Sequence, residues 1–212
     1  MSRNTIFDYR AWPAEGLPHV AALHCLFGVG MAEIRTDTYI FSPARPDWQI
    51  ILHGGTEIEI HEKAEADAPL SGWRVLAHSE FPLRRSVVRT LQEAFPAAQL
   101  SRRIVLPGDV ISCLDSDAEI FTVCKRTVQF HRDGCVAEVT QFDADDRRAE
   151  TFSLTSKRAD TVMDALAMLP APRLPNMDYG AWLKTSPWTA PAIRPARPYQ
   201  QPLIMGAARI AC

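Results

Sequence analysis

Polar and apolar side chains alternate through residues 56–63, which read Thr-Glu-Ile-Glu-Ile-His-Glu-Lys. Successive side chains of a β-strand point to opposite faces, so this stretch predicts a strand with one polar and one apolar face. The polar face carries Glu57, Glu59, His61 and Lys63. An ordinary half-buried strand whose polar face meets water shows the same alternation, so the neighbouring strands must decide between these two interpretations.

The two-residue period recurs along most of the chain. It predicts strands at residues 6–12, 32–41, 48–53, 56–63, 73–81, 100–106, 118–131, 135–142 and 150–155. Apolar residues at helical spacing predict helices at residues 17–27, 84–95 and 160–169. The pairs Gly54-Gly55 and Asp133-Gly134 predict tight hairpin turns, so the strands on either side of each pair should run antiparallel.

Residues 32–41 repeat the charged face of residues 56–63. Their polar face carries Glu33, Arg35, Asp37 and Tyr39. A closed sheet with a charged interior and an apolar exterior covered by helices would give this pattern on several strands. A series of strands interrupted by few helices also excludes a doubly wound parallel sheet. We therefore predict an α+β fold with an antiparallel β-sheet that is strongly curved or closed into a tunnel-like barrel, with flanking helices.

Composition restricts the partners and the compartment. The 212 residues are 47% hydrophobic and 23% charged, as in globular proteins, and the formal net charge of −2 argues against a general nucleic-acid binder. No run reaches the roughly 18 apolar residues of a membrane span. The five cysteines have no metal-type spacing and suit free thiols, and the N-terminus lacks the apolar core of a signal peptide. We expect a cytoplasmic protein that contacts neither nucleic acid nor membrane.

The composition changes after residue 169. Eight of the 16 prolines lie in residues 170–212, a segment expected to be extended or polyproline-like. We therefore predict an α+β barrel-like domain at residues 1–169 and a Pro-rich C-terminal extension at residues 170–212. The aromatic residues Trp182, Trp188 and Tyr199 suggest that parts of this extension dock on the barrel or on a protein partner.

Several separate pieces of the chain resemble one family. Residues 6–10, Ile-Phe-Asp-Tyr-Arg, lie where that family begins with a Glu-x-Glu-x-Lys strand, and Asp37-Thr-Tyr39 is similar to its Asp-x-Tyr-Tyr strand. Residues 123–126, 136–139 and 150–154 resemble the strands of its second half, and residues 176–183 its closing segment. The family is the CYTH superfamily of triphosphate tunnel metalloenzymes, which includes thiamine triphosphatases and one class of adenylyl cyclases. In an alternative register, the opening signature falls on residues 57–61, with histidine in place of lysine.

The resemblance implies a tunnel that binds a triphosphate or another phosphorylated or anionic small molecule. It places the ligand-binding groups at Arg10, Arg35, His61, Lys63, Lys125 and Arg126. It also implies that Mg²⁺ or Mn²⁺ is held by Glu57, Glu59 and Glu138. Triphosphate cleavage needs a divalent cation on carboxylates to neutralise developing charge, and several Lys or Arg residues on the phosphate oxygens.

The chain departs from the family pattern in its acids and bases. The opening signature is reduced to Asp8 and Arg10, and Ser153 and Thr155 follow Glu150 where a second acid is expected. Two hypotheses follow. The protein is either a binding protein that holds an anionic ligand in the tunnel without catalysis, or a metal-dependent triphosphate or phosphoanhydride hydrolase. A third alternative is an unrelated lipocalin-like or sandwich fold with an apolar ligand.

Overall fold

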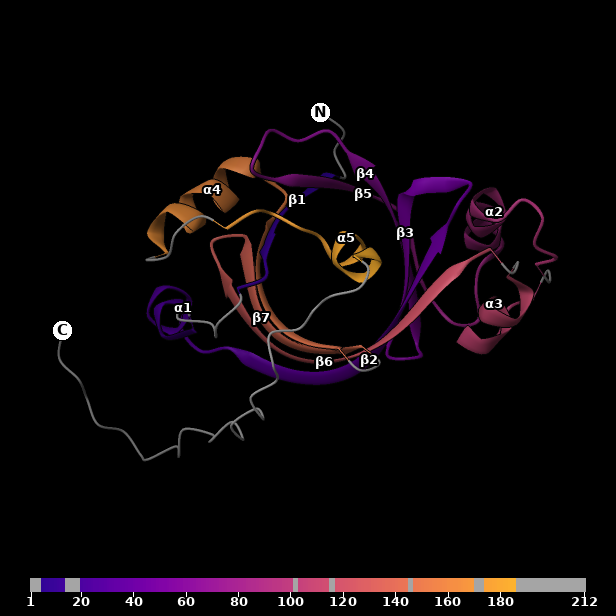
Figure 1. Cartoon of the computed structure of the whole chain (residues 1–212), viewed down its shortest axis with the longest axis horizontal. Helices are drawn as coiled ribbons and strands as arrows, with labels where there is room; N and C mark the ends of the chain where they lie inside the picture. The colour runs from indigo at the N-terminus through magenta and orange to yellow at the C-terminus, as the bar shows by residue number, and fades with distance from the viewer. Residues whose placement is uncertain are drawn as a thin grey trace.

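Eight antiparallel strands close into a barrel in the computed structural model, which describes residues 5–13, 20–100, 103–114, 117–144, 147–169 and 174–185. The strands are β1 (Thr5–Ala11), β2 (Met31–Ser42), β3 (Arg45–His53), β4 (Glu57–Ala64), β5 (Ser71–Glu80), β6 (Glu119–Arg132), β7 (Cys135–Ala144) and β8 (Arg147–Ser156). Their order is β1-β5-β4-β3-β2-β6-β7-β8, and β8 pairs back to β1 (Figure 1). The predicted antiparallel, closed α+β fold is confirmed.

Both predicted hairpin turns form, and their residues have positive φ angles, a conformation that favours glycine. Gly54 and Gly55 join β3 to β4 with φ angles of 54° and 77°, and Asp133 and Gly134 join β6 to β7 at 49° and 77°. Glycine adopts this left-handed conformation without a steric penalty, and aspartate tolerates it better than most residues. These turns set the register in which Ile60 pairs with Ile50 and both point out of the barrel into an apolar cluster.

Four helices cover the apolar outer surface of the barrel on two sides (Figure 1). On one side, α1 (Val20–Phe27) and α4 (Ala159–Met168) pack over a cluster that includes Phe7, Phe130 and Leu154. On the other side, α2 (Arg85–Ala94) and α3 (Pro107–Cys113) lie over the outward isoleucines of β3 and β4. The outward apolar positions are therefore buried by helices, which leaves the polar positions of the same strands to face inward.

A fifth helix, α5 (Tyr179–Lys184), lies inside one end of the barrel (Figure 1). Its Tyr179, Trp182 and Leu183 belong to an apolar cluster with inward residues of the strands, among them Tyr39, Phe41, Ile51, Val123 and Phe142. The segment before the helix is fastened by side chains: Asn176 accepts a hydrogen bond from the backbone of Arg10 and donates to the carbonyls of Asp8 and Pro69. The C-terminal segment therefore closes one end of the tunnel.

Two expectations about local structure differ from the molecule. Residues 103–106 are not a strand. Ile104 instead packs under α2, its carbonyl accepts a hydrogen bond from the backbone N–H of Leu83, and α3 begins at Pro107. Within the extension, Tyr179–Lys184 is helical rather than extended, because Asp178 caps the helix and its aromatic residues are buried. Trp188, Tyr199 and the rest of residues 186–212 lie outside the described residues. None of the described helices is long and apolar enough to cross a membrane.

Candidate functional site

The tunnel interior collects most of the side chains that the sequence nominates. Strand register places the following on inward faces: Arg10 on β1, Arg35 on β2, Glu57, Glu59 and His61 on β4, Lys125 on β6 and Glu138 on β7. Lys63 lies at the α5 end of β4, 3.4 Å from Asp178 and half exposed. Arg126 points to the outer surface, with 57% of its side chain exposed and Asp143 3.7 Å away, so the structure does not bring it to the tunnel.

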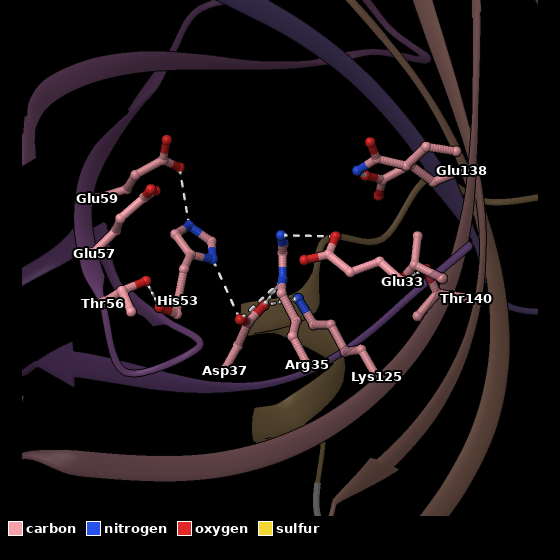
Figure 2. Close-up of polar contacts among 12 residues, drawn as sticks. Glu33, Arg35, Asp37, His53, Thr56, Glu57, Glu59, Lys125, Glu138 and Thr140 are labelled. Atoms are coloured by element: carbon pink, nitrogen blue, oxygen red, sulfur yellow. Dashed lines mark hydrogen bonds and ion pairs between the residues drawn. The ribbon is translucent and has the colours of Figure 1, made fainter. Parts of the chain in front are cut away.

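Three cationic groups converge on the carboxylate of Asp37, which is fully buried on β2 (Figure 2). Lys125 donates a hydrogen bond of 2.7 Å, Arg35 Nε lies at 3.1 Å and His53 Nδ1 at 3.3 Å. Burial alone would raise the pKa of Asp37, but the bonds from His53 and Lys125 hold it well below its usual range. Asp37 therefore stays ionised, and Arg35 also lies 3.3 Å from Glu33 Oε2.

His53 continues the network towards β4. Its Nε2 lies 3.1 Å from Glu59 Oε2, and His61 Nε2 lies 3.2 Å from the same oxygen. Burial lowers the pKa of His53, but the carboxylates of Asp37 and Glu59 outweigh it and raise the pKa to about 9. The hydrogen bonds of His53 and His61 in turn lower the pKa of Glu59. At neutral pH, His53 is an imidazolium between two carboxylates.

Arg10 supplies a second cationic centre, close to α5. Its Nη2 donates to Ser153 Oγ at 2.9 Å and to Glu138 at 3.4 Å, and Glu138 also accepts a 2.7 Å bond from Gln129. The ring centroid of Tyr179 lies 3.9 Å from the guanidinium carbon of Arg10 and 4.3 Å from Lys125 Nζ. A ring face attracts cations, so Tyr179 holds together two buried cations that come from different strands.

The three carboxylates nominated for a metal do not form one donor set. Glu57 pairs with His78 at 3.2 Å, Glu59 lies between His53 and His61, and Glu138 contacts Arg10 and Gln129. Within the described ranges, no three or more His, Cys, Asp and Glu side chains are arranged to hold a metal ion. Mg²⁺ needs several oxygen ligands that converge on one point. The arrangement of these acids therefore does not fit the implied Mg²⁺ or Mn²⁺.

Unmet hydrogen-bonding capacity in the tunnel is mostly that of donors. The buried side-chain atoms without a hydrogen-bond partner among the described residues are Arg10 Nη1, Gln49 Nε2, His53 Nδ1, His61 Nε2 and Asp37 Oδ1. His53 Nδ1 and Asp37 Oδ1 lie 3.3 Å apart, and His61 Nε2 lies 3.2 Å from Glu59, which leaves Arg10 Nη1 and Gln49 Nε2, both of them donors. Buried polar groups normally find partners, so a ligand that completes this site would bring acceptors.

Sequence reasoning did not nominate Asp37, His53, Tyr39 or Tyr179 as site residues. A signal existed for Asp37, which shares the face of Arg35 and is the first residue of the Asp37-Thr-Tyr39 pattern similar to a family motif. His53 on β3 is paired with Asp37 on β2 and with Glu57 on β4. These neighbours become visible only when the strands are paired. Tyr179 reaches the site from a helix that the proline content of its segment did not suggest.

Comparison with known proteins establishes the fold. No protein-family model matches the chain, and no curated protein matches it by sequence. A candidate adenylate cyclase from Bacillus halodurans superposes with a TM-score of 0.51 at 6% identity, over 84% of this chain and 96% of that one. A conserved hypothetical protein from Pyrococcus furiosus gives 0.51 at 11% identity, over 81% and 94%. A candidate adenylyl cyclase from Hippeastrum, with a dominant triphosphatase activity, gives 0.44 at 10% identity over 77% and 84%, too weak a superposition to support an argument.

These likenesses confirm the resemblance at the level of fold. The chain has the same closed-barrel fold as the proteins from Bacillus halodurans and Pyrococcus furiosus. At identities this low the likeness establishes architecture and not activity, because one fold supports many functions.

Proposed function

We propose that this protein binds a phosphorylated or otherwise anionic small molecule in the tunnel, without metal-dependent catalysis. The observation that carries the proposal is the convergence of Lys125, Arg35 and His53 on the single carboxylate of Asp37. Glu33 and Glu59 balance the charges of Arg35 and His53, but the ammonium of Lys125 and the guanidinium of Arg35 carry more donors than their contacts with Asp37, Tyr39 and Glu33 use, so this centre can bind an incoming anion. Charge-assisted hydrogen bonds from Arg and Lys are the usual means of holding phosphate oxygens.

The unpartnered donors support the same conclusion. Arg10 Nη1 is buried and lacks an acceptor, and its guanidinium is held by Ser153 and by the ring of Tyr179. A phosphate or carboxylate oxygen would supply that acceptor. A buried donor left without a partner costs about 1–3 kcal/mol, so pairing it contributes to the binding free energy.

The alternative is a metal-dependent hydrolase of a triphosphate or phosphoanhydride. In that case Glu57, Glu59 and Glu138 would leave His78, His53, His61 and Arg10 to converge on Mg²⁺ or Mn²⁺. Glu59 resists this change, because its carboxylate already contacts two imidazoles and its pKa is lowered by them. Binding without turnover therefore agrees better with the contacts in the tunnel.

Calorimetric titration with phosphate, pyrophosphate and triphosphate, in EDTA and then in excess Mg²⁺ or Mn²⁺, tests the proposal. We expect binding in EDTA that Arg35→Gln weakens at least about tenfold, because the substitution removes one charged partner of the anion. Arg126→Gln makes the same change on the outer surface and should leave affinity unchanged. Heat with none of the three anions, or equal affinities for the two variants, would contradict the proposal.

Turnover is measured on the same samples by release of inorganic phosphate. Release that rises with protein concentration, requires Mg²⁺ or Mn²⁺ and disappears in Glu59→Gln would establish the hydrolase instead. We expect no release above that of the buffer.

A further inference from the structure

The two ends of the tunnel differ in chemistry. Phe41 and Glu33 lie on the same inward face of β2, eight residues and therefore about 26 Å apart along the strand. Phe41 packs in the apolar cluster around α5, so Glu33 lies towards the opposite end. On β4, Lys63 pairs with Asp178 next to α5, whereas Glu57 is at the other end of the strand. A small molecule therefore enters at the end that carries Glu33 and Glu57.

Carboxylates gather at this open end. Glu57 and Glu80 are paired residues of β4 and β5, so two like charges lie directly opposite each other on one face. Such cross-strand pairs repel unless a cation lies between them. The nearest partner is His78, 3.2 Å from Glu57, and an imidazole is cationic only when protonated. Glu33 stands across the tunnel from Glu57, and its carboxylate lies 3.3 Å from Arg35 Nη1 (Figure 2). The side chains of Glu33 and Glu57 are 47% and 40% exposed.

The buried part of the same tunnel holds both signs of charge, but a donor there lacks a partner. Lys125 and Arg10 are more than nine-tenths buried beside the acids Asp37, Asp8 and Glu138, and Arg10 Nη1 has no acceptor. A ligand that follows the tunnel inward meets exposed carboxylates first and then this unpartnered donor. These two features suit a molecule with a cationic group at its outer end and an anionic group at its inner end.

We propose that the ligand is dipolar: a small molecule with a phosphate or carboxylate at one end and an ammonium group at the other. This inference rests on the anion-binding function proposed above. The anionic group pairs with Arg35, Lys125 and the unpartnered Nη1 of Arg10. The ammonium group remains at the open end, between Glu33 and the Glu57–Glu80 pair, where it relieves the repulsion between Glu57 and Glu80.

The same charge distribution selects against inorganic polyphosphates. A linear chain of phosphates carries negative charge along its whole length, so its outer part would lie beside Glu33, Glu57 and Glu80. Repulsion between like charges weakens the binding of the wrong ligand and so contributes to specificity. The acids at the open end thus act in specificity, which accounts for residues that phosphate binding alone does not require.

Strand register also limits the distance between the two charges of the ligand. Glu57 is directly opposite His53, and His53 contacts Asp37 at the cation centre. Side chains of directly paired residues are about 5 Å apart at Cβ. A linker of two or three carbon atoms is therefore sufficient, and phosphoethanolamine is a suitable probe.

The experiment compares phosphoethanolamine with n-propyl phosphate, which replaces the ammonium group by a methyl group of similar size. Calorimetry in EDTA at low salt measures both affinities, and β-alanine replaces phosphate by carboxylate. We expect the wild-type protein to prefer phosphoethanolamine about five- to tenfold, the size expected for two or three partly exposed charge pairs. In Glu57→Gln/Glu80→Gln the preference should fall to about twofold or less, with n-propyl phosphate bound at least as tightly as before.

A control variant separates local from general charge effects. Glu93→Gln/Asp164→Asn removes the same two negative charges from exposed positions on α2 and α4, and should keep the wild-type preference. Equal binding of the two phosphates by the wild-type protein would overturn the dipolar ligand and leave anion binding intact. Failure of both phosphates and of β-alanine to bind would instead overturn the proposed function. Tighter binding of β-alanine than of phosphoethanolamine would assign the anionic end to a carboxylate.

Discussion

Lys125 Nζ and Asp37 Oδ2 are 2.7 Å apart at the centre of the barrel, although 88 residues separate them in the chain. Both side chains are almost completely buried, and Lys125 also donates to the hydroxyl of Tyr39 at 2.5 Å. A buried ion pair adds little to stability when compared with a well-packed apolar pair, but the loss of one member leaves the other charge unpaired.

Replacement of Lys125 should therefore destabilise the fold strongly. We expect Lys125→Met to lower the free energy of unfolding by about 3–5 kcal/mol, measured by urea denaturation. Asp37→Asn/Lys125→Met should recover part of this loss, because no unpaired buried charge remains. Lys184→Met, which removes a lysine paired with exposed Glu119, should change stability by less than about 1 kcal/mol. A Lys125→Met protein as stable as Lys184→Met would show that Asp37 is not a buried carboxylate.

The network around His53 predicts how stability depends on pH. The folded pKa of His53 is raised to about 9, above its ordinary value of 6.5, so its contribution is complete below pH 6.5 and is lost as the pH rises through 9. Asp37 and Glu59 have lowered pKa values, so their contribution is lost as the pH falls below about 4. Stability should therefore be greatest between these limits.

The His53→Gln variant isolates the alkaline side of this dependence. Between pH 6.5 and pH 9.5 the wild-type protein should lose about 2 kcal/mol more than the variant, allowing for partial exposure of the imidazole to solvent. His131→Gln, at an exposed position of β6, should keep the wild-type slope. Parallel curves for the wild-type protein and His53→Gln would refute the ionised network.

Tyr179 connects the C-terminal segment to both buried cations, and this contact should be measurable in the stability of the whole chain. Tyr179→Leu removes the ring over Arg10 and Lys125, and should lower the free energy of unfolding by roughly 2–4 kcal/mol. Tyr179→Phe keeps the ring and should cost less than about 1 kcal/mol. Equal effects of the two substitutions would mean that the hydroxyl, and not the ring face, is the important part.

Alternation along the strands predicted which residues face the tunnel, because the register of a half-buried strand cannot slip by one residue without exposing its apolar face. Ile58 and Ile60 are buried outside the barrel, which directs Glu57 and Glu59 inward. The same rule separates Lys125 from Arg126: adjacent residues cannot share a face. Arg126 was nominated with its neighbour, yet alternation alone places it outside.

Alternation does not predict which inward residues meet across the tunnel. Glu57, Glu59 and Glu138 share the interior, but the closure of β8 onto β1 decides that Glu138 meets Arg10 and that Glu59 meets two histidines. The position of Tyr179 depends on α5, whose burial the proline-rich composition of residues 170–212 concealed. These contacts join residues far apart in sequence, and a local pattern carries no information about them.

The position of α5 predicts opposite effects of one substitution at two glycines. At Gly180 an added Cβ would lie 2.8 Å from a ring carbon of Phe41, closer than real Cβ atoms approach neighbouring atoms, and 3.0 Å from Gln49 Nε2. Gly180→Ala should therefore displace α5 and lower the free energy of unfolding by about 1–3 kcal/mol in chemical denaturation. At Gly108, in α3, nothing lies within 4 Å of an added Cβ, and alanine favours the helix, so Gly108→Ala should be neutral or stabilise by up to about 1 kcal/mol. If Gly180→Ala were as stable as Gly108→Ala, the helix would not be packed against Phe41 inside the barrel, and the closed end of the tunnel would have to be reconsidered.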